Sequence, residues 1–132
     1  MSRPTVPQLD HMAPVLVVER VEPCVAFWVD RFGFEVKHEV PWHDGSVFFA
    51  SVVKGGIEIM YQTRVSVAAD SPQAGELPGR SSVLYFTVPD LEVVERATAG
   101  APVFKPRHQT PYGSTELYLR EPGGHVVGFA QF

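Results

Sequence analysis

Residues 13–33 read APVLVVERVEPCVAFWVDRFG, and this stretch decides the fold. Its valine-rich beginning, Ala13–Val18, is short and is followed by charged residues, which is typical of a β-strand. Apolar residues then recur at the spacing of an amphipathic helix, at Val21, Val25, Trp28 and Phe32. Gly33 follows this stripe and ends the predicted helix. The chain therefore opens with a strand and a helix.

The same order of elements is predicted twice along the chain. The first helix is followed by runs of strand-forming residues at 34–40, 46–53 and 57–61. A second strand is expected at 82–88, and a second helix begins at the N-cap Asp90 and ends at Gly100. Further strands are expected at 103–105, 114–119 and 126–131.

One offset relates the two halves. Aligning Val18 with Val88 sets an offset of 70 residues, which also superimposes three later strands, with Phe48 on Tyr118 and Ile59 on Phe129. We interpret the chain, residues 1–132, as a single α+β domain built from two βαβββ modules. Module one spans about residues 12–62, a linker spans about 63–80, and module two spans about 81–132.

The composition excludes several classes of function. The formal net charge of −4 is too acidic for binding a nucleic acid backbone, and either favours a cationic ligand or only keeps the protein soluble. No apolar run approaches the roughly 20 residues of a membrane helix. The single cysteine, Cys24, forms no intramolecular disulfide and is predicted to pack in the core. We expect no nucleic acid or membrane partner, and a cytoplasmic location.

Two motifs resemble those of a known family. Residues 14–34, PVLVVERVEPCVAFWVDRFGF, resemble the opening signature of the glyoxalase/bleomycin resistance/extradiol dioxygenase group, the vicinal oxygen chelate superfamily. Pro111-Tyr112-Gly113, followed by EPGGH at 121–125, resembles its closing pattern. The likeness covers about residues 12–132 and is greatest to the metal-free bleomycin-resistance proteins. It implies two half-barrels, each with one sheet face on its helix and the other lining a pit, in a homodimer.

The resemblance also implies where a metal ion would be bound. Enzymatic members use four side chains, from the first and last strands of each module, and these positions fall on Ala13, Glu58, Val83 and Gly128. Three of the four carry no donor atom, and one carboxylate alone does not hold a divalent ion. We therefore expect no metal and no cofactor. The alternative is a site rebuilt from histidines, which otherwise are surface or turn residues, at His38, His43, His108 and His125.

Alternation along the strands sorts the side chains into two sets. The apolar set is predicted to pack on the helices and contains Leu16, Val18, Ile57, Ile59, Leu84, Phe86, Leu117, Leu119, Val127 and Phe129. The opposite set, which includes Ala50 and Arg120, mixes rings with carboxylates and suits a flat aromatic or cationic ligand. With two rim aromatics, the predicted ligand-binding residues are Trp42, Phe48, Glu58, Met60, Tyr85, Tyr112, Glu116 and Tyr118. The alternative is that the rings fill the second sheet face or a dimer contact.

Two functions remain open at this stage. The first is a metal-independent protein that sequesters a bleomycin-type or other aromatic or cationic antibiotic. The second is a lyase-like or dioxygenase-like enzyme that acts on a small carbonyl or aromatic substrate through Glu58, Glu116 or a rebuilt metal site. Glu58 would pair with a cation, act as a general base with a raised pKa, or only bond Arg120 or water. Residues 1–12 either form an arm exchanged between subunits or are disordered.

Overall fold

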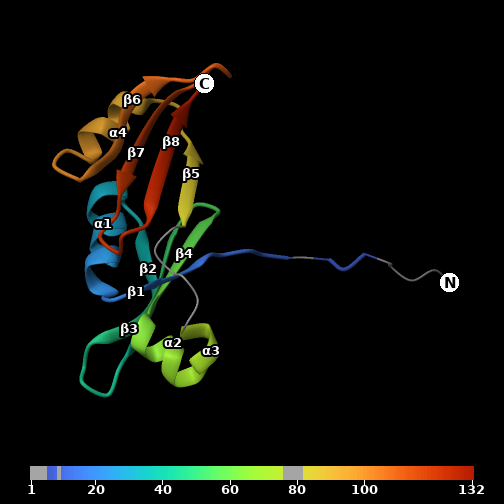
Figure 1. Cartoon of the computed structure of the whole chain (residues 1–132), viewed down its shortest axis with the longest axis vertical. Helices are drawn as coiled ribbons and strands as arrows, with labels where there is room; N and C mark the ends of the chain where they lie inside the picture. The colour runs from blue at the N-terminus through green and yellow to red at the C-terminus, as the bar shows by residue number, and fades with distance from the viewer. Residues whose placement is uncertain (1–5, 9, 76–81) are drawn as a thin grey trace.

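The computed structural model describes residues 6–8, 10–75 and 82–132, and within them it has two modules of the predicted order (Figure 1). Module one consists of β1 (Val15–Val18), α1 (Glu22–Phe32), β2 (Glu35–Pro41), β3 (Val47–Lys54) and β4 (Ile57–Thr63). Module two consists of β5 (Val83–Thr87), α4 (Leu91–Ala97), β6 (Val103–Gln109), β7 (Thr115–Arg120) and β8 (Val126–Gln131). The predicted α+β repeat is confirmed.

Each module forms its own four-stranded mixed sheet. The strand orders are β1-β4-β3-β2 and β5-β8-β7-β6, so the two sheets have the same topology. The first strand runs parallel to the last, and the other neighbours are antiparallel. The parallel strands are joined by a long crossover, which runs through α1, β2 and β3 in module one and through α4, β6 and β7 in module two. The helices α1 and α4 each pack on one face of their own sheet. The other face of each sheet is left without a helix of its own module.

The segment between the modules is more regular than the sequence predicted. Where we expected a linker at about 63–80, β4 ends at Thr63 and two short helices follow, α2 (Arg64–Asp70) and α3 (Pro72–Gly75). Thr63 is the N-cap of α2, and its Oγ1 accepts a hydrogen bond from the Ser66 N–H at 3.2 Å. Residues 64–70 contain neither Pro nor Gly, so the chain can form a helix here. Residues 76–81 lie outside the described part of the chain.

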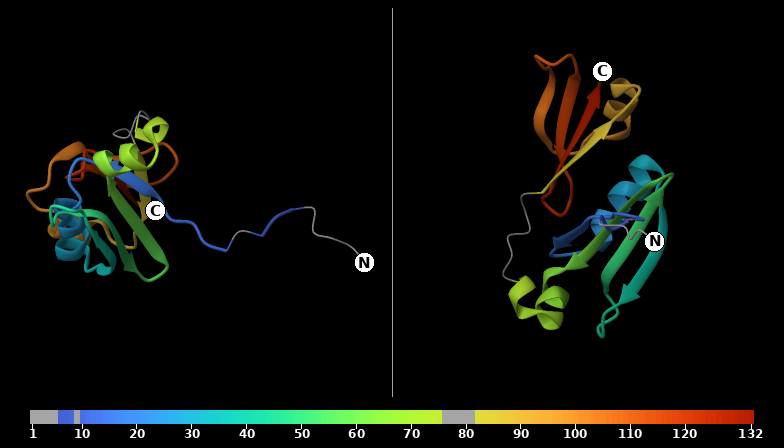
Figure 2. Two further views of the ribbon diagram at one scale, coloured as in Figure 1. Left: turned by 90° about the horizontal axis from the view of Figure 1, so that it is seen from below. Right: turned by 90° about the vertical axis from the view of Figure 1, so that its right-hand side faces the viewer.

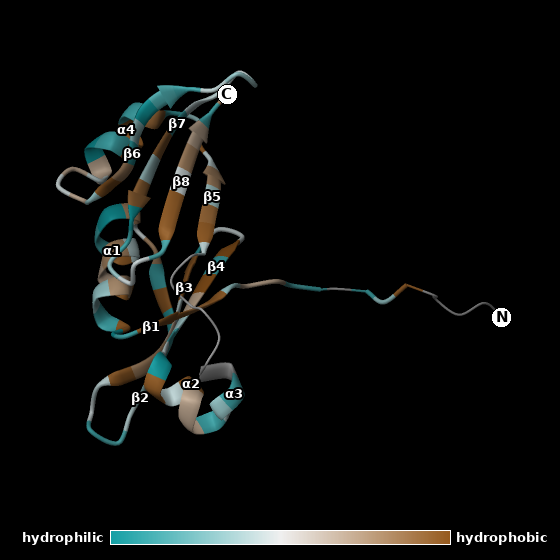
Figure 3. Cartoon of the chain, viewed as in Figure 1, coloured by the Kyte–Doolittle hydropathy of each residue, from teal (hydrophilic) through white to brown (hydrophobic). Residues whose placement is uncertain are grey.

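One apolar core joins the two modules. The rings of α1 lie against the sheet of module two, with 5.6 Å between the ring centroids of Trp28 and Phe86 and 5.4 Å between those of Phe32 and Phe129. Figure 2 shows α1 close to the sheet of module two, and Figure 3 shows the apolar strands that face the core. Burial of each such side chain stabilises the fold by about 1.5–3 kcal/mol. The helix of module one therefore fixes module two against module one.

Most of the predicted core residues are buried, and two predicted positions are wrong. Ile57 is 42% exposed, although the alternation placed it in the core. Ala50, predicted on the pit face, is fully buried opposite Tyr61 on the helix face. In the observed sheets Ala50 corresponds to Leu117, an offset of 67 instead of 70. Because the two offsets differ by an odd number, the side chains of β3 that follow the bulge, from Phe49 on, lie on the opposite face from the one predicted.

A chain of buried hydrogen bonds also links the modules. The Trp28 Nε1–H donates to the Tyr61 hydroxyl at 2.9 Å, and that hydroxyl donates to Glu121 Oε2 at 2.7 Å. The other oxygen of Glu121 accepts the His125 N–H at 2.7 Å. Glu121 is only 2% exposed, so this carboxylate depends on these donors in place of water. The network connects α1 and β4 to the turn between β7 and β8.

We expect Tyr61→Phe to lower the free energy of unfolding by about 1–3 kcal/mol, because it leaves the Trp28 N–H and one oxygen of Glu121 without their buried partner. Urea denaturation followed by circular dichroism measures this loss. Tyr112→Phe is the matched control, since Tyr112 is 63% exposed and should cost less. Equal losses in the two variants would contradict the structural role given to this network.

Candidate functional site

The open sheet face of module two carries a row of tyrosines across its central strands. Gly128 of β8 lies opposite Tyr85 of β5 on one side and Tyr118 of β7 on the other. A Cβ atom at residue 128 would lie 2.7 Å from Tyr118 Cδ2, and closer still to Cε2. The missing side chain therefore lets the Tyr118 ring lie flat over the sheet.

The carboxylate of Glu116 lies at the centre of this face. It is 1% exposed and accepts hydrogen bonds from four hydroxyl groups. Oε2 accepts from Tyr85 at 2.5 Å, Ser114 at 2.8 Å and Tyr112 at 3.0 Å, and Oε1 accepts from Tyr118 at 2.8 Å. We call Tyr85, Tyr112, Ser114, Glu116 and Tyr118 the tyrosine cluster. Its members come from β5, β7 and the loop before β7.

The hydroxyl groups decide the charge of the tyrosine cluster. Burial opposes ionisation of Glu116, but the four hydroxyl donors outweigh it and lower its pKa to about 2. Burial and the neighbouring Glu116 raise the pKa of Tyr118 to about 12. The hydrogen bonds to Glu116 raise the pKa values of Tyr85 and Tyr112 as well. At neutral pH the cluster is one carboxylate surrounded by neutral phenols.

A hollow of about 360 Å³ lies beside the tyrosine cluster. Its walls include Phe104, Lys105, His108, Tyr112, Glu116 and Tyr118. The His108 ring stacks on Tyr118 with 6.1 Å between centroids and 20° between planes. The hollow thus offers aromatic faces and one ammonium group to a ligand, beside the buried carboxylate of Glu116.

Glu58 lies in a second cluster, on the open face of module one. The Ser51 hydroxyl donates to one of its oxygens, while the other accepts from His11 Nε2 at 2.8 Å and lies 3.7 Å from Lys37 Nζ. The hydrogen bonds from Ser51 and His11 lower the pKa of Glu58. The predictions of a raised pKa and of Arg120 as the partner are therefore wrong; Arg120 donates to the Gly124 carbonyl at 2.6 Å.

The remaining predicted ligand-binding residues lie apart from the tyrosine cluster. Trp42 packs on Phe48 and His43, with centroid distances of 5.2 and 4.8 Å. Phe48 is the extra residue of a bulge in β3, where Val47 and Phe49 are the paired residues. Met60 lies opposite Ser51 in module one. The structure thus brings together Tyr85, Tyr112, Glu116 and Tyr118, and places Glu58 and Met60 in the other module.

The residues at the four positions implied for metal ligands do not suit a metal ion. In the observed register Val83 lies opposite Val126, so Val126 and not Gly128 is the counterpart of Glu58. Valine has no donor atom either, and both oxygens of Glu58 already accept hydrogen bonds. Across residues 6–8, 10–75 and 82–132, no three His, Cys, Asp or Glu side chains are grouped as metal ligands.

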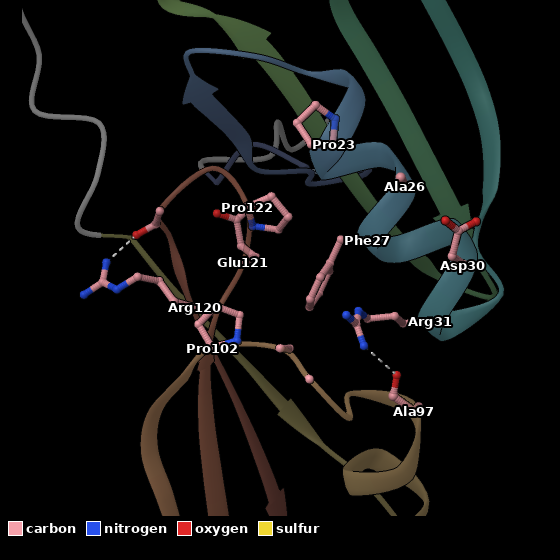
Figure 4. A pocket seen from close by; sticks show the side chains of 13 residues that line it. Pro23, Ala26, Phe27, Asp30, Arg31, Ala97, Pro102, Arg120, Glu121 and Pro122 are labelled. Carbon is pink, nitrogen blue, oxygen red and sulfur yellow. Dashed lines mark hydrogen bonds between the residues drawn. The ribbon is translucent and has the colours of Figure 1, made fainter.

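A larger hollow, of about 860 Å³, lies elsewhere, between α1 and module two (Figure 4). Three of its charged side chains are already engaged. Arg31 donates to the carbonyls of Ala97 and Ala99, Arg120 bonds the Gly124 carbonyl, and Glu121 belongs to the buried network. We therefore locate the candidate site at the tyrosine cluster, whose smaller hollow has the aromatic faces.

Comparison with known proteins identifies the scaffold. The model of the glyoxalase/bleomycin resistance protein/dioxygenase superfamily matches residues 8–129. The chain belongs to this superfamily. A search of curated proteins gave no match. In the described residues, no helix of this superfamily member is long and apolar enough to cross a membrane.

Solved structures of several other proteins have the same fold. TioX from Micromonospora sp. ML1 is 24% identical, with a TM-score of 0.71 over 92% of this chain and 98% of that one. Lactoylglutathione lyase from Agrobacterium tumefaciens is 22% identical, with a TM-score of 0.71 over 95% of each chain. The bleomycin-binding protein of Streptomyces verticillus, complexed with copper(II)-bleomycin, is 25% identical, with a TM-score of 0.60 over 94% and 97%. Enzymes and binding proteins therefore share this scaffold.

Gly128→Ala tests the packing of the tyrosine cluster. The new methyl group would push the Tyr118 ring off the sheet, so we expect a loss of about 1–3 kcal/mol in the free energy of unfolding. Gly56→Ala is the control, because a Cβ atom at Gly56 would meet no atom within 4 Å. Thermal unfolding of the two variants measures the difference. A Gly128→Ala protein as stable as Gly56→Ala would contradict the observed position of Tyr118.

Proposed function

We propose that this protein binds a flat aromatic or cationic small molecule at the tyrosine cluster, without a metal ion and without turnover. The observation that carries the proposal is the buried, ionised Glu116 held among three tyrosine rings beside an open hollow. Aromatic faces next to a fixed negative charge attract flat cations. Sequestration needs no catalytic group, which agrees with the missing metal ligands.

A bleomycin-type antibiotic is the ligand we propose first. The opening motif of the sequence resembles the bleomycin-resistance proteins, and the bleomycin-binding protein of Streptomyces verticillus shares the scaffold at 25% identity. Cys24, a buried free thiol, is compatible with a reducing cytoplasm, where we expect the protein to act. Tyrosine rings provide stacking surface that a planar heteroaromatic group requires.

We propose that the functional form is a homodimer. On the open faces of the sheets, several large apolar side chains are exposed, among them Val15 at 47%, Val83 at 56% and Tyr85 at 46%. Exposed apolar patches of this kind mark surfaces that another protein covers. A second copy would cover these faces and close the hollow beside the tyrosine cluster, so that both subunits contribute to the pit.

Isothermal titration with metal-free bleomycin tests the proposed ligand. We expect saturable binding, and a Tyr118→Ala variant that binds at least about tenfold more weakly, because it loses a stacking ring of the hollow. Val65→Ala, on the exposed surface of α2, is the control and should bind like the unmodified protein. No saturable heat, or equal affinity of Tyr118→Ala and the unmodified protein, would count against binding at this site.

An enzyme is the second candidate, and one observation favours it. The imidazole of His11 is hydrogen-bonded to Glu58, and a histidine oriented by a carboxylate is a common general base. A hollow of about 260 Å³ lies next to Glu58 and also contacts Tyr85. His11 and Glu58 both belong to module one, so this candidate function has its own base and carboxylate, although its hollow shares Tyr85 with the tyrosine cluster.

Metal retention separates the two candidates. After dialysis against Zn²⁺, Mn²⁺ or Fe²⁺ and removal of free ions, we expect no stoichiometric metal by elemental analysis, because Ala13, Val83 and Val126 offer no donor. Bound metal at one ion per chain, with formation of lactoylglutathione from methylglyoxal and glutathione, would favour the enzyme. Turnover lost in Glu58→Gln, with bleomycin binding intact, would assign that activity to module one.

A further inference from the structure

We propose that Glu116 is a positioning residue that fixes the hydrogen-bond polarity of the tyrosine cluster, so that the cluster accepts hydrogen bonds from its ligand and cannot donate them. The inference rests on the proposed function and names the ligand class: a planar group rich in N–H donors, such as an amidinium, a guanidinium or an amino-substituted heterocycle. Glu116 itself would not touch the ligand.

The first step is the orientation of the hydroxyl groups around the carboxylate. Glu116 accepts four hydroxyl groups at 2.5 to 3.0 Å, three on Oε2 and one on Oε1. Each of these hydroxyls has a single hydrogen atom, and that hydrogen points to Glu116. Tyr85, Tyr112 and Tyr118 therefore have no hydrogen left to donate, and because Glu116 is 1% exposed, a ligand does not reach its carboxylate directly.

The same order extends into the loop before β7. Ser114 gives its hydroxyl hydrogen to Glu116, so its oxygen can only accept from its neighbour Thr110. Thr110 Oγ1 lies 2.7 Å from Ser114 Oγ and 3.2 Å from the Ser114 carbonyl, and it accepts the Ser114 N–H at 3.1 Å. Its hydroxyl hydrogen therefore also points inward, to Ser114. Every hydroxyl of this group is oriented by the one buried charge.

The second step is access from outside. Tyr85 is 46% exposed and Tyr112 is 63% exposed, so ligands can approach these two side chains from solvent. A phenol that donates to a carboxylate becomes a better acceptor, because the hydrogen bond shifts electron density onto its oxygen. These oxygens therefore present partial negative charge and free lone pairs to the solvent. N–H groups satisfy them, and carboxylates are repelled.

The competing attraction comes from β6. Lys105 and His108 line the same hollow, and their Cα atoms lie opposite Tyr118 and Glu116. A ligand that bound mainly through Lys105 would be an anion. The accepting tyrosine oxygens thus predict a ligand with N–H donors, whereas the ammonium group of Lys105 predicts an anion. Small ligands of the two kinds, compared in one experiment, distinguish these predictions.

Three benzene derivatives of similar size serve as probes: benzamidine, its fully N-methylated cation and benzoate. In NMR titrations of the full ¹⁵N-labelled chain, we expect benzamidine to bind at least about tenfold more tightly than either of the others, with shifts at residues of the tyrosine cluster. The methylated cation keeps the charge and loses the N–H donors, so it separates hydrogen bonding from simple attraction.

Glu116→Gln should abolish this preference. A glutamine amide donates through its nitrogen and accepts only through its oxygen, so at least one tyrosine hydrogen would turn toward the ligand. We expect the benzamidine-to-benzoate affinity ratio to fall by about tenfold or more. Glu92→Gln, an exposed charge on α4, removes the same charge elsewhere and should leave the ratio unchanged.

Several outcomes would overturn the inference. On the unmodified protein, these outcomes are that the methylated cation binds as tightly as benzamidine, that benzoate binds more tightly than benzamidine, or that no probe shifts the signals of the tyrosine cluster. In a folded Glu116→Gln protein, the contradicting outcome is an unchanged benzamidine-to-benzoate affinity ratio. If Glu116→Gln does not fold, the ranking of the three probes on the unmodified protein decides alone. Bleomycin binding is measured in a separate experiment. If the protein prefers benzamidine but does not bind bleomycin, this inference stands and bleomycin is rejected as the ligand.

Discussion

The packing of α1 against both sheets is the constraint from which the rest of the architecture follows. Trp28 and Phe32 contact the apolar side chains of module two, and Trp28 also reaches Glu121 through Tyr61. Since this shared core packs against the helix-facing sides of the two sheets, the opposite faces are left open. Both carboxylate clusters lie on those faces.

The two buried carboxylates of module two show how such charges are stabilised without a cation. Glu121 and Glu116 are 2% and 1% exposed, and both accept hydrogen bonds from neutral donors. Removing such a group from water is costly unless every lone pair finds a donor. Glu121 accepts one hydrogen bond on each oxygen within the core and joins the modules, whereas three of the four donors of Glu116 are tyrosines that reach the surface. The same physical solution thus gives a structural link in one place and the proposed binding surface in the other.

The sequence predicted the order of the elements along the chain, both main helices and the pit-facing residues of β7, because Glu116, Tyr118 and Arg120 alternate there with Leu117 and Leu119. It failed for β3, where a bulge at Phe48 and a shorter offset invert the faces. The convergence of Tyr85, Tyr112 and Tyr118 on one carboxylate was not predictable, since they come from three separate segments. Ser114 was detectable in principle as a hydroxyl two residues before Glu116, but His11 gave no signal, because only the path of the chain brings it to Glu58.

Glu58 and Glu116 are the same residue type, yet their surroundings give them different electrostatic effects. Lys37 lies 3.7 Å from Glu58, and His11 supplies a further partner that carries positive charge when protonated, so the field of Glu58 is largely cancelled locally. The four donors of Glu116 are neutral, so its charge remains and is transmitted outward through the tyrosine oxygens. This difference supports the proposal that a cationic ligand binds at module two. Module one, with its imidazole and ammonium groups, suits an anionic or carbonyl-bearing molecule better, so one scaffold offers two faces of different chemistry.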